Sequence, residues 1–331
     1  MPLISVDSVT KDYGHGRGNF DVKLDVDEGE VFGFVGVNGA GKTTLIRQMM
    51  GFLKSDSGSI TIEGRDAWGE SSVIKRHVGY VPGEIAFPDS PTGTAFLKKQ
   101  ADLLNLKDMS RADEITKLLQ LDPTANLKRM SKGMKQKTAI VAAFMASPSI
   151  LLLDEPTTGL DPLMRRDFID LIAEEKAKGT TVFMSSHMFE EVEECCDRVA
   201  FIRDGSIMDI KRTVEIAHNT NKLYKAEFST ASDYERFTSQ VPASRDAEGT
   251  QQTQSGDQPG TKARQLQAQQ GALYIEQLRP DQNQAFIRVH DNAINQFMAA
   301  LGTVNVKFIT EVKYSLEQYF KDLNTEENNV Q

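Results

Sequence analysis

The sequence predicts an α/β domain over residues 1–218, followed by a smaller α+β domain over residues 219–331. Three observations support this division. Short apolar runs alternate with helical stretches in the first part, and one of these runs leads into a glycine-rich turn and a helix. From Asn221 onward the runs become amphipathic instead. A chain of 331 residues is also long enough for two domains.

The apolar runs of the first domain are the candidate strands. They cover residues 31–36, 77–81, 150–154, 181–186 and 198–202. Short, continuous apolar strands are typical of a sheet that is covered on both faces. A largely helical stretch over residues 93–146 interrupts them, and within it Ile115, Leu118 and Leu119 follow helical spacing.

The glycine-rich turn is GVNGAGKT, Gly36–Thr43, which matches the phosphate-loop pattern G-x-x-x-x-G-K-[ST]. The strand before it and the helix after it disfavour a chance glycine-rich turn. Glycines let the backbone wrap around an oxyanion, and a helix N-terminus adds partial positive charge. We expect Lys42 to reach the outer phosphates and the Thr43 hydroxyl to hold Mg²⁺. The expected nucleotide-binding residues are Gly36, Asn38, Gly39, Ala40, Gly41, Lys42, Thr43 and Thr44.

A second chemical motif is SILLLDEP, residues Ser149–Pro156, an apolar strand that ends in two acids. Carboxylates at the C-terminal end of such a strand lie where α/β sheets bind ligands. After a phosphate loop, this pattern predicts that Asp154 holds Mg²⁺ and that Glu155 polarises the attacking water as general base. Strand-end acids that only cap the strand are the structural alternative.

Between these motifs lies MSKGMKQ, residues Met130–Gln136, in which a Ser and a Gly open a helix. Here the chain resembles the ATP-binding-cassette (ABC) ATPases, whose signature is commonly LSGGQ. It keeps Ser131 and Gly133, and it carries Lys132 and Met134 where the family has Gly and Gln. The resemblance implies a P-loop NTPase fold with a RecA-like core and a helical subdomain, with Ser131 and Gly133 near the γ-phosphate.

Further positions match the family in order. TGLDP, residues 158–162, resembles the D-loop, whose acid is Asp161. His187 ends TVFMSSH at the position of the family's switch histidine, where an imidazole donates to the γ-phosphate. Tyr13 stands where the family places an aromatic residue under adenine, although a turn-packing Tyr gives the same pattern. One position departs, because Gly83 stands where the family has a metal-linking Gln, and Glu84 beside it is the candidate replacement.

Composition limits the function classes. Charged residues make up 26% and hydrophobic residues 39% of the chain, and the net charge of −9 disfavours a nucleic-acid partner. The longest apolar run, Ala139–Ala146, has eight residues, whereas a membrane-spanning helix needs about 20. The N-terminus shows no secretory signal, and Cys195 and Cys196 are expected to be reduced thiols in a cytosolic protein.

The second domain is expected to be a ferredoxin-like α+β unit in the order β-α-β-β-α-β. Its first strand alternates, with Tyr224, Ala226 and Phe228 on one face. Residues 244–271 are rich in Gln and Gly, and we expect a disordered loop there, with a partner-binding tail as the alternative. The ending SLEQYF resembles the tails of single-cassette ATPases of bacterial drug, bacteriocin or ABC-2-type exporters.

The resemblance implies that the chain binds and hydrolyses ATP with Mg²⁺ as the ATPase subunit of an ABC transporter, and we expect an exporter. Its expected partners are a second cassette, identical or different, and a separate membrane permease that contacts the segment near Phe87 and Phe96. The expected location is the cytoplasmic face of the cell membrane. A non-transport ABC ATPase of translation or DNA repair is the alternative. A regulator without turnover is disfavoured because Glu155 and His187 are both present.

Overall fold

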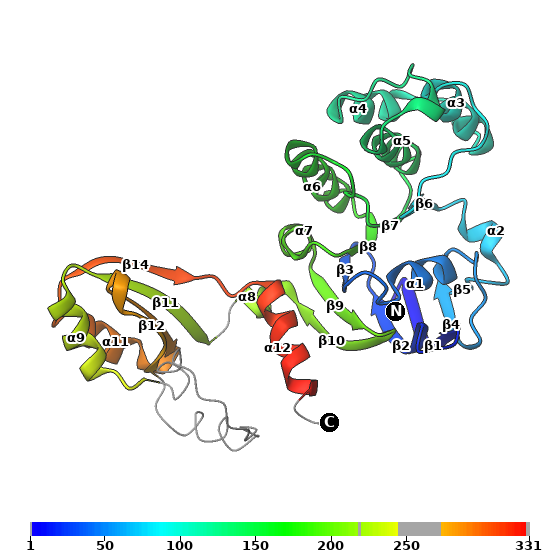
Figure 1. Ribbon diagram of the computed structural model, residues 1–331. Coiled ribbons are helices and arrows are strands. Elements are labelled where there is room, and N and C mark those ends of the chain that lie inside the picture. Colours follow the sequence, from blue (N-terminus) through cyan, green and yellow to red (C-terminus); the bar gives the residue numbers. More distant parts are fainter. Residues whose placement is uncertain (1, 218–219, 244–272, 329–331) are drawn as a thin grey trace. The chain divides into compact units, whose positions relative to one another are not determined.

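The computed structural model describes residues 2–217, 220–243 and 273–328. The chain divides into two compact units, Met1–Thr213 and Val214–Gln331 (Figure 1). The segment 244–271, for which we expect a disordered loop, lies outside the described residues. Within the described residues, every helix is too short or too polar to span a lipid bilayer.

The first unit is built on a six-stranded sheet in the order β10-β9-β3-β8-β7-β6. Its strands are β3 (Val31–Val35), β6 (Val78–Val81), β7 (Ile150–Asp154), β8 (Thr181–Ser186), β9 (Arg198–Arg203) and β10 (Ser206–Arg212). All neighbours are parallel except β9 and β10. Every residue of β3, β7 and β8 is buried, as expected for continuous apolar strands. The five strands predicted from apolar runs are confirmed.

A second, antiparallel sheet covers the N-terminal part and was not expected from the sequence. It has the order β2-β1-β4-β5, with β1 (Ile4–Asp12), β2 (Gly18–Val26), β4 (Ser57–Ile62) and β5 (Arg65–Asp66). The register of β1 with β2 shifts between Val6 and Val9, so buried and exposed residues do not alternate regularly along β1. Its apolar face shares one core with Leu45 and Met49 of α1 (Lys42–Met49) and with Phe34 of β3.

The helical stretch predicted over residues 93–146 is confirmed. It contains α3 (Gly93–Leu103), α4 (Ser110–Leu118), the 3-10 turn η1 (Leu127–Arg129) and α5 (Lys132–Phe144), which lie together (Figure 1). Ile115 and Leu119 are buried, whereas Leu118 is 37% exposed and does not belong to the apolar face. Three further helices belong to the core unit: α2 (Ser71–Ile74), α6 (Pro162–Ala177) and α7 (Phe189–Cys195).

The second unit contains a four-stranded antiparallel sheet in the order β12-β13-β11-β14. Along the chain its elements are β11 (Asn221–Phe228), α9 (Ala231–Gln240), β12 (Leu273–Arg279), β13 (Gln284–His290), α11 (Ile294–Leu301), β14 (Val306–Val312) and α12 (Leu316–Asn328). The short helix α8 (Thr213–Ala217) precedes them, and the 3-10 turns η2 (Pro280–Gln282) and η3 (Asp291–Ala293) flank β13. Ala226 and Phe228 are buried with Phe237 and Phe297 of the helices, and Tyr224 packs on this core, as the alternation predicted.

Candidate nucleotide and hydrolysis site

The phosphate loop joins β3 to α1 at the carboxyl edge of the parallel sheet. Gly41 is the N-cap of α1 and has a φ of 107°, while Gly39 has a φ of 85°. Both values lie in the left-handed region that favours glycine. The first-turn N–H groups of α1 lie beyond the reach of its own carbonyls, so they are available to an anion at the loop. Of the predicted residues, Asn38 and Gly39 are exposed, whereas Gly36 and Ala40 are buried.

Two neighbouring segments brace this loop from outside. The Asn19 side-chain amide donates to the Gly41 carbonyl at 3.2 Å, and the Gly205 N–H donates to the Ala40 carbonyl at 3.0 Å. A Cβ at Gly41 would lie only 2.6 Å from the Asn19 amide nitrogen and 2.8 Å from the Gly18 carbonyl oxygen. The loop is therefore tied to β2 and to the β9–β10 turn, and a side chain at position 41 would push it away from them.

Lys42 is buried at the centre of the site, with 4% of its surface exposed. Its Nζ donates to the Gly36 carbonyl at 2.7 Å and to the Val37 carbonyl at 3.1 Å. It also pairs with Glu155 Oε1 at 3.3 Å. The ammonium therefore lies inside the curve of the phosphate loop, where it can face phosphate oxygens. Thr43 and Thr44 follow it on the first turn of α1 and are partly exposed.

Asp154 ends β7 and is fully buried. Ser185 Oγ of β8 donates to its Oδ1 at 2.7 Å, whereas its Oδ2 has no hydrogen-bond partner among the described residues. A buried carboxylate oxygen without a donor costs free energy unless a cation or another donor satisfies it. The donor set therefore fits a hard cation such as Mg²⁺, which prefers carboxylate and hydroxyl oxygens. Burial raises the pKa of Tyr80 on β6 to about 12, and the Asp154 charge adds to this rise.

Glu155 connects Lys42 of the phosphate loop to His187. One oxygen, Oε1, faces Lys42, while Oε2 lies 3.2 Å from His187 Nδ1 and accepts from Thr158 Oγ1 at 3.3 Å. The residue has a φ of 48°, a strained value for a non-glycine residue. Its N–H donates to both the carbonyl and the hydroxyl of Ser185, each at 3.1 Å, and these contacts hold the turn. The structure thus brings Lys42, Glu155 and His187 together.

The adenine candidate, Tyr13, follows β1 directly and is 50% exposed. Its N–H donates to the Arg17 carbonyl at 2.9 Å, and Lys11 Nζ lies 5.9 Å from its ring centroid. The turn that carries Tyr13 leads into Asn19, which contacts Gly41. The ring therefore belongs to the turn that adjoins the phosphate loop, and half of its surface is exposed.

The signature and D-loop residues cap helices at a different place in the chain. Ser131 is the N-cap of α5 and its Oγ accepts from the Met134 N–H at 3.2 Å, while Asp161 caps α6 and accepts from the Met164 N–H at 3.0 Å. Both caps are exposed. Within the part of the chain that is described, no hydrogen bond or ion pair joins Ser131 to the phosphate loop. One chain thus brings together Lys42, Glu155 and His187 without the signature.

Two glycines of these motifs are required by close approach. A Cβ at Gly133 would lie 2.8 Å from the Gly159 carbonyl oxygen, so the start of α5 rests on the D-loop of the same chain. A Cβ at Gly83 would lie 2.8 Å from Asp154 Oδ2 and 3.1 Å from its Cγ. Glycine at 83 therefore lets the segment after β6 lie against the candidate metal ligand. Glu84, the suggested replacement for the missing Gln, is exposed.

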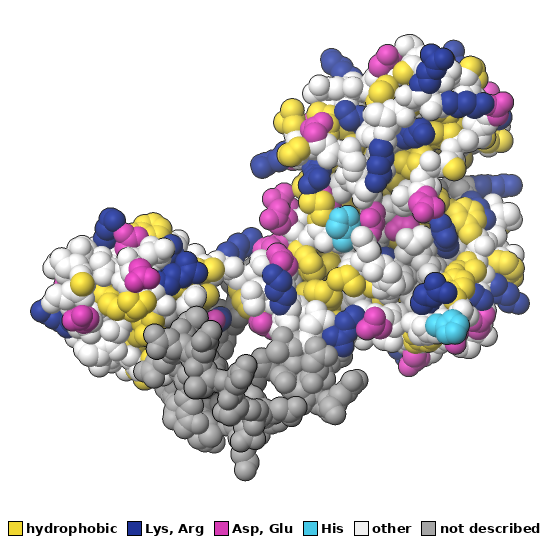
Figure 2. All heavy atoms as spheres, viewed as in Figure 1, with side chains coloured by type: hydrophobic (Ala, Val, Ile, Leu, Met, Phe, Trp, Pro, Cys, Tyr) yellow, Lys and Arg dark blue, Asp and Glu magenta, His cyan; other side chains and the backbone are white. Residues whose placement is uncertain are grey.

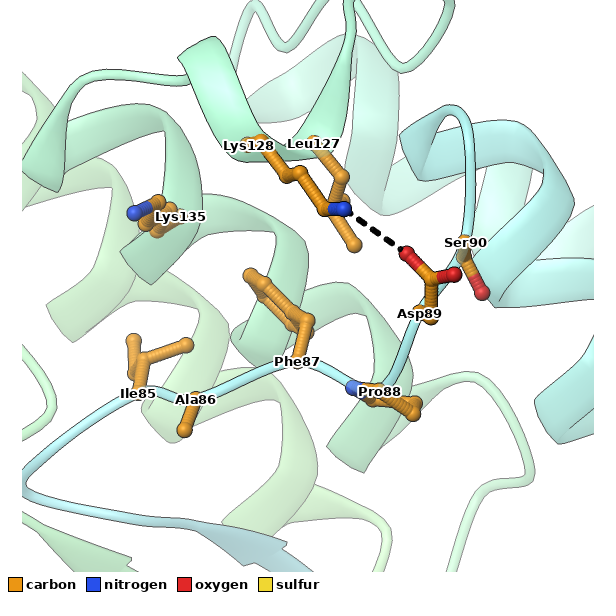
Figure 3. Close-up of a pocket in the computed structure, with 9 residues that line it drawn as sticks. All are labelled: Ile85, Ala86, Phe87, Pro88, Asp89, Ser90, Leu127, Lys128 and Lys135. Atoms are coloured by element: carbon orange, nitrogen blue, oxygen red, sulfur yellow. Dashed lines mark ion pairs between the residues drawn. The ribbon is translucent and has the colours of Figure 1, made fainter.

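The segment after β6 also lines a pocket of about 410 Å³ (Figure 3). Figure 3 shows Phe87 extending from this segment into the pocket and Lys128 paired with Asp89 at its rim, at 3.0 Å. The ring of Phe87 contacts the buried Phe96 edge to face, with centroids 4.7 Å apart. The lining residues are Ile85, Ala86, Phe87, Pro88, Asp89, Ser90, Leu127, Lys128 and Lys135.

Sequence reasoning missed two residues that shape the site, Ser185 and Asn19. Ser185 pairs in register with Asp154 across β7 and β8, so its hydroxyl donates to the Asp154 carboxylate and accepts from the backbone N–H of Glu155. A signal existed, because two neighbouring apolar strands both end in polar residues. Asn19 lies on the unexpected strand β2, and no pattern around it indicates contact with a loop 22 residues away.

Comparisons with known proteins agree with this geometry. Residues 20–158 match the family model described as ABC transporter. The chain is 37% identical over 209 residues to the uncharacterized ABC transporter ATP-binding protein YdbJ of Bacillus subtilis. The aligned region covers 62% of this chain and 68% of that protein. It is 33% identical to the bacitracin transport ATP-binding protein BcrA of Bacillus licheniformis, over 62% of this chain and 69% of that one.

A solved structure titled as the ATP-binding subunit of an ABC transporter superposes with a TM-score of 0.60 at 29% identity, over 65% of this chain and 91% of that chain. The residues that match the family model, 20–158, include the phosphate loop and the acid pair Asp154 and Glu155. The length shared with these relatives, the matching family model and the cassette fold show that the chain belongs to the ABC transporter family as an ATP-binding subunit.

Proposed function

We propose that Glu155 is the general base of ATP hydrolysis in this chain and that Lys42 and His187 act on the γ-phosphate. The observation that supports this assignment most directly is the position of Glu155 between the other two side chains, with one carboxylate oxygen toward each. A base must lie within hydrogen-bond reach of the water it activates. Lys42 neutralises phosphate charge, and His187 orients the carboxylate and donates to the phosphate.

Asp154 and Thr43 are the proposed metal ligands. The unpartnered Asp154 Oδ2 and the Thr43 hydroxyl supply the oxygen atoms that Mg²⁺ prefers. When bound, Mg²⁺ would neutralise charge on the transferred phosphoryl group. Ser185 keeps the other Asp154 oxygen fixed, so the free oxygen has one orientation. Glu84 remains a candidate for an outer contact through water, because the segment that carries it lies against Asp154.

The remaining nucleotide contacts are assigned by position. Tyr13 would lie under adenine, because its exposed ring is carried by the turn next to the phosphate loop. Ser131, Gly133 and Asp161 would act on the nucleotide held by a second cassette. The exposure of Ser131 and Asp161 supports this assignment, as does the lack of any hydrogen bond or ion pair between Ser131 and the phosphate loop among the described residues. The second unit, approximately residues 219–331, would be an accessory domain.

We further propose that the permease docks on the pocket of the Ile85–Ser90 segment. The partly exposed Phe87 and the apolar walls offer a surface for an apolar partner segment, and the same segment adjoins the metal ligand Asp154. Movement of the permease could thus reach the hydrolysis site directly. The relation to a bacitracin transport protein supports export as the direction of transport, and such a chain would work at the cytoplasmic face of the cell membrane.

Replacing Glu155 with Gln tests the central assignment. The substitution keeps the size of the side chain and removes its ability to accept a proton, so turnover should fall by about 100-fold or more. ATP affinity should be retained, and ATP should hold the mutant as a dimer. Steady-state ATPase assays, fluorescent-nucleotide binding and size-exclusion chromatography measure these quantities. Lys42→Ala is the contrasting variant, because it should lose ATP binding itself. Normal turnover in Glu155→Gln would overturn the assignment.

A further inference from the structure

Glu191 is a buried carboxylate that the proposed reaction does not use. It belongs to α7, lies four residues after His187 in the sequence, and is only 4% exposed. Its Oε1 is buried without a hydrogen-bond partner among the described residues. Leaving a carboxylate oxygen unpaired away from water is destabilising, so a carboxylate at this position does more than fill space.

The other oxygen of Glu191 joins two segments of the hydrolysis site. Thr157 Oγ1 donates to Oε2 at 2.7 Å, and Ser186 Oγ lies 3.2 Å from the same oxygen. Both hydroxyl residues are buried. Thr157 follows Glu155 by two residues, and Ser186 directly precedes His187. A single carboxylate oxygen thus links the segment that carries the base to the segment that carries the switch histidine.

The oxygen without a hydrogen bond, Oε1, faces α6. Arg165 Nε lies 4.0 Å from Glu191 Oε1 and donates to the Leu160 carbonyl at 3.3 Å. Leu160 directly precedes Asp161, and Gly159 before it contacts the start of α5 through Gly133. The charge of Glu191 therefore attracts the guanidinium that holds the D-loop backbone.

From these contacts we propose that Glu191 is a positioning residue that keeps His187 aligned with Glu155 and couples both to the D-loop through Arg165. The inference rests on the proposed roles of Glu155 and His187. The two kinds of contact that Glu191 makes, with the hydroxyl groups and with Arg165, can be removed separately. The hydroxyl contacts need only an acceptor oxygen, which Gln also offers, whereas attraction of Arg165 needs the negative charge.

Three variants separate these contributions. Glu191→Ala removes both and should lower kcat by about 100-fold, because a displacement of about 1 Å at a reacting group has an effect of that size. Glu191→Gln removes only the ionic contact and should lower kcat by about tenfold. Arg165→Met removes the ionic contact together with the hydrogen bond to the Leu160 carbonyl and should lower kcat by at least as much. The Kd for ATP, measured by fluorescent-nucleotide titration, should stay within about threefold of the wild-type value. Glu190→Gln on the exposed face of the same helix is the matched control and should leave kcat unchanged.

A double variant tests the coupling. Glu191→Gln combined with Arg165→Met should be no slower than Arg165→Met alone, because Arg165→Met already removes the ionic contact that Glu191→Gln removes. Multiplied losses, or a loss of ATP affinity and thermal stability with kcat intact, would refute the positioning role. If Glu191→Ala does not fold, Glu191→Gln and Arg165→Met still test the proposal. If Glu191→Gln and Arg165→Met are fully active while Glu155→Gln and His187→Ala are inactive, this inference alone is refuted. Normal turnover in Glu155→Gln and His187→Ala would refute the proposed function instead.

Discussion

At the scale of single residues, the site depends on where polar atoms are left unsatisfied. Asp154 has one oxygen fixed by Ser185 and one without a partner among the described residues. Glu155 holds a backbone conformation that few side chains adopt. Such features are costly to folding, and they persist where the surrounding contacts over-determine them. Here those contacts come from the neighbouring strand β8.

The close approach of Gly83 to Asp154 gives a residue-scale prediction. A Cβ at position 83 would lie 2.8 Å from Oδ2, so Gly83→Ala and Gly83→Gln must both displace the carboxylate or the segment after β6. Both variants should lower kcat by about tenfold and raise the Mg²⁺ concentration needed for half-maximal turnover. ATPase assays over a magnesium titration measure this.

The matched control is Gly302→Ala, where an added Cβ has no contact closer than 3.4 Å. Greater activity in Gly83→Gln than in Gly83→Ala would instead show that the chain accommodates a family-like glutamine, and it would contradict the steric explanation.

At the scale of elements, an arginine links the helical segment to α6. Arg111 of α4 pairs with Glu174 of α6 at 3.0 Å and with the buried Glu175 beside it. Glu175 also accepts from Lys178 at 3.1 Å and from Thr180 at 3.2 Å. The side chain of Arg111 is only 12% exposed and that of Glu175 only 1%, so water screens the pair between them weakly. Figure 2 shows that Lys and Arg side chains are spread widely over the α3–α5 segment.

Removing that arginine should therefore weaken the fold. Arg111→Met leaves Glu175 with fewer donors, and we expect a loss of about 2 kcal/mol in the free energy of unfolding. Urea denaturation followed by circular dichroism measures it. Lys117→Met, an exposed position on the same helix, should change stability little. Equal effects of the two substitutions would show that the cluster contributes no more than surface charge.

Prediction of elements from the sequence succeeded where burial is complete and failed where it is partial. β3, β7 and β8 are buried at every residue, so their apolar runs are unambiguous. β1 alternates imperfectly because its register shifts after Val6, and β10 is only half-buried, so neither gives a clear period. The chemical residues of the phosphate loop follow from a contiguous motif. The contacts of Ser185, Asn19 and Glu191 depend on tertiary register, which local spacing does not encode.

At the scale of the whole molecule, one chain holds only part of the proposed site. Lys42 and Ser131 both belong on a γ-phosphate, and the described residues of a single chain do not bring them into contact. Nucleotides buried between two subunits need donors from both sides to offset desolvation. A head-to-tail pair of cassettes provides them.

Mixing two inactive variants tests this arrangement. Lys42→Ala and Ser131→Arg should each inactivate a homodimer. A mixture should recover up to about a quarter of wild-type turnover, because half of random pairs are mixed and each has one intact site of two. ATPase assays before and after mixing, with chain exchange followed by fluorescence transfer, measure this. No recovery despite exchange would indicate a site built within one chain. A heterodimeric native pair would require one lesion on each partner.

The pairing of β3 has a consequence for synthesis of the chain. The strand that leads into the phosphate loop lies between β8 and β9, so its neighbours on both edges come from residues 181–203. A ribosome that adds 5–20 residues per second needs about ten to thirty seconds to make the intervening chain. Throughout that interval the nascent loop lacks the sheet that shapes it, so nucleotide cannot stabilise the emerging domain. We therefore expect the chain to bind ATP only after residues 181–203 have been synthesised and have paired with β3.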